Sequence, residues 1–186
     1  MDALQLRGIS FYIYKKNMVS KKDAVAAEFY QKYINAVKEK NVMQALQKTS
    51  ADFKKLLEEI PRKKMDYAYA EGKWTIKELL QHIIDAERVF VYRALRFARK
   101  DSTPLASFDQ NSWAANAQTN NRKWNELVKE FKALRKSTEI LFESFNDDQL
   151  LSTGTASNNN INVVALGFIA AGHVAHHINI IKERYL

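Results

Sequence analysis

Residues 162–184 read NVVALGFIAAGHVAHHINIIKER and contain three of the four histidines of this chain. Their apolar residues follow the helical period, so the segment predicts a long, largely buried helix. The chain of 186 residues has only two prolines and five glycines, which argues against the frequent turns of an all-β sandwich. The longest purely apolar stretch, Val163 to Ala171, is far shorter than the ~20 residues that cross a bilayer. We therefore expect a helical protein without a membrane span.

Three other segments have the same helical period. The second begins with Thr75 and Glu78, which form a capping box, and the first ends before Pro61, which cannot continue a helix. The long connection between the second and third contains Pro104 and is typical of a crossover. Together the four segments predict an all-α fold, an antiparallel four-helix bundle with a long crossover between the second and third main helices. The first, second and third segments are residues 41–60, 75–99 and 119–145, and the crossover is residues 100–119.

The N-terminal region precedes this pattern. Ser20 and Asp23 are spaced to cap a shorter helix that runs through Phe29, Tyr33 and Val37. Residues 1–19 are interpreted as a poorly ordered tail, and residues 20–186 as one helical domain. Because Met18 follows the tail, we hypothesise that residues 1–17 are dispensable or come from an upstream start.

Composition limits the chemistry. The chain has no cysteine, so disulfides and thiolate ligands are excluded, and any transition metal must be held by nitrogen and oxygen atoms. A reducing, cytoplasmic setting fits this composition. The net charge of +8 comes from basic residues spread among 21 acids, so we expect no specific nucleic-acid partner. Glycine-rich phosphate loops and a G-x-S-x-G elbow are absent.

The histidines are the candidate site. At 100° per residue His173 and His177 lie within about 40° of each other, in the middle of the apolar stripe, and His176 turns about 60° towards its edge. His82 lies at the margin of the apolar face of the second helix. The three imidazoles of His82, His173 and His177 could converge on one ion at about 2.0–2.1 Å. The alternative is that they are hydrogen-bonded core residues.

Three neutral imidazoles leave an ion its full divalent charge, which would lower the pKa of bound water towards ~7 or stabilise a thiolate. Val174 stands where the H-E-x-x-H zinc-protease motif has its glutamate, so a protease of that type is disfavoured.

Charged residues lie on the same helix faces. Arg93 and Arg184 project with the histidines and are candidates to hold a substrate carboxylate, although structural ion pairs are the simpler interpretation. Glu87 and Asp85 could orient a ligand histidine, but pairing with an arginine of the bundle is favoured.

The chain resembles the DinB/YfiT-like superfamily of metal-binding four-helix bundles over roughly residues 43–186. The stretches that carry the resemblance are Gly72-Lys73-Trp74-Thr75 leading to His82, Asp85-Ala86-Glu87-Arg88, Tyr92-Arg93-Ala94-Leu95-Arg96-Phe97-Ala98-Arg99, Phe108-Asp109-Gln110, and Ala171-Gly172-His173-Val174-Ala175-His176-His177.

This resemblance implies one divalent ion, zinc or nickel or a similar metal, bound by His82, His173 and His177. It implies a thiol-dependent S-transferase that acts on a small molecule and uses a low-molecular-weight thiol, whose carboxylates Arg93 or Arg184 could hold. Two alternatives stay open: a metal-dependent hydrolase that uses metal-bound water, and a non-catalytic stress-response protein that binds metal. Similar proteins often form dimers, so a homodimer is a further expectation.

Overall fold

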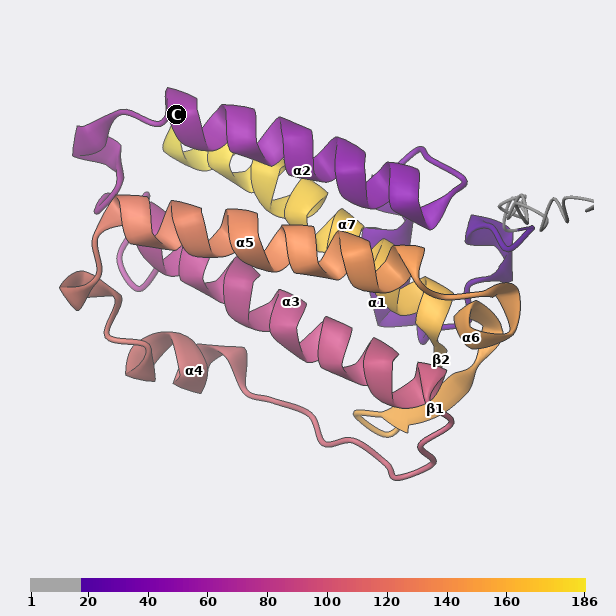
Figure 1. Ribbon diagram of the computed structural model, residues 1–186. Helices are drawn as coiled ribbons and strands as arrows, with labels where there is room; N and C mark the ends of the chain where they lie inside the picture. Colours follow the sequence, from indigo (N-terminus) through magenta and orange to yellow (C-terminus); the bar gives the residue numbers. More distant parts are fainter. Residues whose placement is uncertain (1–17) are drawn as a thin grey trace, which may run out of the picture.

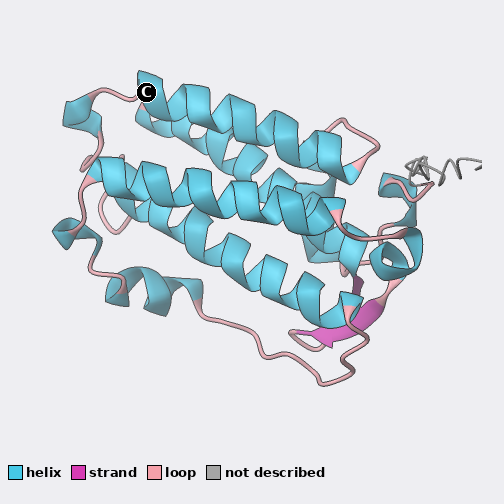
Figure 2. Cartoon of the chain, in the orientation of Figure 1, coloured by secondary structure: helices cyan, strands magenta, loops and turns pink. Residues whose placement is uncertain are grey.

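Four long helices form the body of the protein, whose computed structural model describes residues 18–186. Figure 1 shows them running side by side, and Figure 2 shows how little of the chain is strand. They correspond to the four predicted segments, so the predicted bundle and its long crossover between the second and third main helices are confirmed. The predictions for residues 1–17 lie outside the described residues. The four helices are α2 (Val42–Glu59), α3 (Ile76–Ala98), α5 (Trp124–Glu143) and α7 (Val163–Ile180).

The C-terminal helix α7 is the central element. It packs against α1, α2 and α3, and nearly all its side chains up to Val174 are buried. The segment Val163–Tyr185 is long and apolar enough to cross a membrane, but 78% of its most apolar window is buried inside the fold. Burial on every side explains its all-round apolar composition. A π-helical turn, η4 (Ile181–Tyr185), follows α7.

The N-terminal helix α1 (Glu28–Ala36) crosses α7 very closely. A β-carbon added at Gly172 would lie 1.8 Å from the carbonyl oxygen of Tyr33, so only glycine permits this approach. The Ser20 and Asp23 box was predicted to cap this helix, and that was wrong. It caps a separate 3₁₀ turn, η1 (Lys21–Asp23), because the chain straightens before α1 begins.

The crossover from α3 to α5 contains a short helix, α4 (Gln110–Asn116), and a 3₁₀ turn, η3 (Thr119–Asn121). It runs along the outside of α3 (Figure 1). Consequently α5 begins at Trp124 rather than at Thr119. Ile140 on α5 is 54% exposed, whereas the buried face of α5 includes the polar residues Arg135 and Thr138.

Before α7 the chain forms elements that the helical pattern did not predict: α6 (Asp147–Leu151) and a hairpin of β1 (Thr153–Ala156) and β2 (Asn159–Asn162). Ser157 and Asn158 at the turn have φ of 51° and 62°, as a two-residue hairpin turn requires. The hairpin packs against the end of α3 through Gly154, where a β-carbon would overlap the ring of Phe97. The turn is thereby held beside α3. A further 3₁₀ turn, η2 (Arg62–Lys64), lies between α2 and α3.

Candidate metal centre

Three histidines meet inside the bundle. His82 comes from α3, and His173 and His177 come from successive turns of α7; all three are buried. The Nε2 atom of His173 lies 3.0 Å from that of His82 and 3.1 Å from that of His177. His176 is only partly buried and lies against Tyr33 instead. The structure therefore brings together the three residues predicted as ligands and leaves out the fourth histidine.

Hydrogen bonding alone does not satisfy this cluster. Each Nε2 atom offers either one proton or one in-plane lone pair, yet the Nε2 of His173 faces two others. At least one of these two contacts therefore lacks a good hydrogen bond. Two nitrogen atoms that bind one ion at about 2.1 Å lie roughly 3.0–3.4 Å apart, and the Nε2 of His173 has this spacing to the Nε2 atoms of both other histidines. The donor set therefore fits a divalent transition metal, and a cation would engage all three lone pairs.

The protonation states agree with this fit. Burial lowers the pKa of His82 to about 4. Burial also lowers the pKa of His173 and His177 well below the usual histidine value, and the neighbouring imidazoles lower both further. All three rings are therefore neutral at pH 7, the form that binds metal.

Aromatic side chains fix the orientation of the rings. Trp74 packs on His82 with ring centroids 4.8 Å apart, and the edges of Tyr33 and Phe90 meet His173 at 5.3 and 5.7 Å. The Nδ1 atom of His177 is buried and has no hydrogen-bond partner within residues 18–186. Aromatic packing thus orients the rings of His82 and His173.

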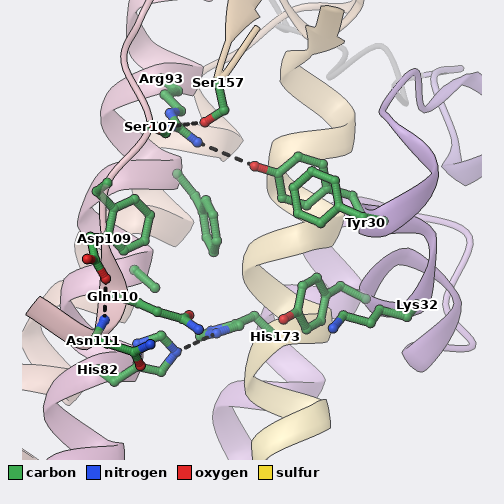
Figure 3. Close-up of a pocket in the computed structure, with 15 residues that line it drawn as sticks. Tyr30, Lys32, His82, Arg93, Ser107, Asp109, Gln110, Asn111, Ser157 and His173 are labelled. Atoms are coloured by element: carbon green, nitrogen blue, oxygen red, sulfur yellow. Dashed lines mark hydrogen bonds between the residues drawn. The ribbon is translucent and has the colours of Figure 1, made fainter. Parts of the chain in front are cut away.

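A cavity of about 520 Å³ opens on the cluster, a size typical of small-molecule sites. His82 and His173 lie at one end, and Arg93 lies at the other beside Ser157 and Tyr30 (Figure 3). A second cavity of about 250 Å³ reaches His177 and is lined by Trp74, Tyr69 and Tyr185. Asn111 of α4 lines both cavities. The histidine cluster is therefore accessible to ligands although each ring is buried.

Comparison with known proteins identifies the family. The family model of the DinB superfamily matches residues 45–181, a span that includes all three histidines. The chain belongs to the DinB superfamily. YfiT from Bacillus subtilis, described as "a probable metal-dependent hydrolase with an unusual four-helix bundle topology", has the same fold. Its TM-score is 0.68 at 18% identity, over 86% of this chain and 87% of that protein.

A sequence relative comes from Oceanobacillus iheyensis and is named "Putative metal-dependent hydrolase OB0413". It is 29% identical over 116 residues, which cover 61% of this chain and 66% of that protein. This DinB superfamily protein thus spans about two thirds of that relative's length.

The two predicted arginines have different positions. Arg93 is buried and lines the large cavity, whereas Arg184 is exposed on η4 and lines neither cavity that reaches the histidines. An α-helical period would have aligned Arg184 with His173 and His177, but the π-turn adds residues to each turn and rotates it away.

The carboxylates predicted to pair with arginines do so. Glu87 is bound by Arg135 at 2.7 Å. Asp85 accepts a hydrogen bond from Gln81 and lies 3.5 Å from Arg88.

Sequence reasoning did not assign a role to Asp109 or Asn111. Both line the large cavity, Asp109 as the N-cap of α4, where its Oδ1 accepts hydrogen bonds from the backbone N–H groups of Asn111 and Ser112. The signal was an Asp that begins a short helix inside a long crossover, and such loops often carry function.

Proposed function

We propose that this DinB superfamily protein is a metal-dependent hydrolase of a small molecule. The observation that carries the proposal is the convergence of three neutral Nε2 atoms at the end of a ligand-sized cavity. Catalytic zinc sites are built in this way, with three protein ligands and an open position. The names of the two related proteins support hydrolysis over other reactions of such a site.

His82, His173 and His177 would hold a divalent ion, with zinc or nickel as the candidates. Such an ion, when bound, polarises a carbonyl or phosphoryl oxygen and lowers the pKa of water towards ~7. Because the ligands carry no charge, this effect would be large. The cavity walls would orient the substrate at the histidines.

Asp109 is the candidate proton acceptor. It is the one Asp or Glu among the described residues that line the large cavity. Its Oδ1 accepts two backbone hydrogen bonds, and its Oδ2 accepts none from the described residues. A carboxylate held by one oxygen at a helix N-terminus is well oriented to accept a proton through the other. In this proposal Asp109 takes the proton that the attacking water loses.

Thiol-dependent transfer is a second candidate, favoured by the second cavity. A hydrolase needs room for one substrate and a water molecule, whereas the cavity at His177 has space for a second reactant. A divalent ion also stabilises a thiolate.

The cytoplasmic location and the homodimer stay predictions.

One experiment separates these functions. Protein loaded with zinc or nickel, and the same protein after metal removal, would be assayed against carboxylic esters, amides and phosphate esters, with and without a cellular thiol. The proposal expects about one ion per chain and metal-dependent hydrolysis without thiol. Product that forms only with thiol would establish transfer, and bound metal without turnover in either assay would favour a non-catalytic role.

Matched variants test the ligand assignment. His177→Ala is expected to reduce the bound metal to near zero by elemental analysis, and His176→Ala to leave it at one ion per chain. Metal retained by His177→Ala would contradict the assignment.

A further inference from the structure

Arg93 shares one face of α3 with His82. They are eleven positions apart in the sequence, which is about three helical turns and a rise of about 16 Å. Ala86 and Phe90 lie between them along the helix, and all four residues line the large cavity. The cavity is therefore an elongated space with the histidines at one end and a guanidinium at the other, as Figure 3 shows.

The guanidinium of Arg93 is buried and has no counter-ion among residues 18–186. The side chain is 2% exposed. Its Nη2 donates to the carbonyl oxygen of Ala106 at 2.7 Å and to Oγ of Ser157 at 3.0 Å, and its Nη1 contacts the hydroxyl of Tyr30 at 3.5 Å. These acceptors are all neutral. Within residues 18–186 no carboxylate lies within 4 Å of Arg93.

A buried charge without a partner is costly, and here the surroundings do not neutralise it. Lys32 also lines the cavity and adds a second positive charge, and Asp109, the one carboxylate among the described residues that line the cavity, forms no salt bridge with Arg93. Phe29 and Phe108 supply apolar walls. The cavity thus offers a cation at its end, an apolar middle and the histidine cluster.

We propose that Arg93 binds the anionic group, a carboxylate or a phosphate, of a substrate whose apolar part lies along the aromatic walls. This proposal rests on the proposed function, because the reacting bond would lie at the histidines. The three helical turns between the sites require an organic spacer of several bonds, since an inorganic anion cannot reach both. Arginine suits such an anion because its planar N–H groups bind two oxygens at once.

Binding of matched ligands tests the proposal. The probes are 3-phenylpropionate, its uncharged amide and phenethyl phosphate, titrated by calorimetry into zinc-loaded and metal-free protein. At least one anionic probe is expected to bind about tenfold tighter than the amide, with or without zinc, and the tighter one identifies the anion. Arg93→Met is expected to remove this preference, and Arg93→Lys to keep part of it.

Controls separate Arg93 from other charges. Arg96→Met, on the same helix but paired with Asp101 and outside the cavity, and Lys32→Met at the cavity wall are expected to keep the preference. Equal binding of amide and anions by the wild type, or no binding of any probe, would overturn the proposal, and these results do not depend on a variant that folds. A preference that survives in Arg93→Met, or that needs zinc, would overturn it as well.

Failure of the proposed function looks different. In that case hydrolysis or metal binding is absent, whereas the preference of the metal-free protein for anions remains.

Discussion

Two buried arginines of this protein have opposite surroundings. Arg135 is fully buried, and Glu87 binds it through both carboxylate oxygens. Its other donors reach Thr49 and the carbonyl oxygens of Leu46 and Ala170. Every N–H group of Arg135 is thus bonded, and its charge is neutralised. Arg93 is buried to a similar degree, but its acceptors among the described residues are all neutral, and it faces a cavity.

Arg135 on α5 belongs to the packing of the bundle, whereas Arg93 on α3 lines the large cavity. The Arg135 pair joins α2, α3, α5 and α7, and Thr138 completes it by donating to Glu87 at 2.8 Å. The pair and its hydrogen-bond partners are buried in the interior of the bundle. Within residues 18–186, the histidine cluster instead has nitrogen atoms that hydrogen bonds do not fully satisfy, and Arg93 has no carboxylate within 4 Å. The polar groups around Arg135 thus satisfy one another, whereas Arg93 and two of the histidines line a cavity.

Breaking the buried ion pair of Arg135 and Glu87 is expected to have the largest effect on the free energy of unfolding. Glu87→Gln would leave Arg135 buried without a negative charge, which typically costs 3–5 kcal/mol. Urea unfolding would measure the loss. The matched control is Asp52→Asn, which removes the exposed pair with Lys48 and is expected to cost less than about 1 kcal/mol. Equal effects of the two substitutions would show that the buried pair has no special structural role.

Metal binding is expected to have the next largest effect on the free energy of unfolding, because the ion would bind the nitrogen atoms of the histidine cluster. Zinc at about 1,000 times its Kd would raise the free energy of unfolding by about 4 kcal/mol. His177→Ala is expected to lose this gain, and His176→Ala to keep it. Thermal unfolding with and without zinc provides the measurement. A gain in His177→Ala equal to that of the wild type would place the ion elsewhere.

The main helices could be predicted because local signals determine them. The Thr75 and Glu78 box caps α3 as expected, with Thr75 N–H donating to Glu78 at 2.7 Å. The hairpin before α7 could not be predicted, because its strands have four residues each and no alternation of apolar side chains. Its position depends on contacts with Phe97 of α3, which are distant in the sequence.

The site was predictable to the extent that it lies on regular helix. Helical angles selected His173 and His177 and placed His82 at the margin of an apolar face, and the family resemblance then implied the same three ligands. The same angles misplaced Arg184, because the π-turn after α7 changes the period. Nor could they show that Arg135 rather than Ile140 faces inward, since that choice depends on Glu87 across the bundle. Asp109 lies outside the four periodic segments, so helical angles did not address it.

A third prediction concerns the pH dependence of stability, to which the buried histidines contribute. The histidine pKa values of the metal-free protein are lowered in the folded state, to about 4 for His82, from the usual 6.5. Between these values the unfolded chain binds more protons, so stability is expected to fall as the pH drops from about 7 to 4. Each histidine contributes up to about 1.4 kcal/mol per pH unit. His82→Gln should flatten the curve, and an unchanged slope would contradict the buried neutral state.

The smallest effect on stability is expected from Asp109→Asn, which nevertheless tests the open cavity most directly. Asparagine caps a helix as well as aspartate does, so the hydrogen bonds to the backbone of α4 should survive and the free energy of unfolding should change by less than about 0.5 kcal/mol. The variant removes only the charge and the proton acceptor. If Asp109 accepts the proton of the attacking water, kcat should fall by about 10²-fold or more while the bound metal is unchanged. Normal turnover by a stable, metal-loaded Asp109→Asn would exclude Asp109 as the base, whereas a loss of stability would make it a structural cap.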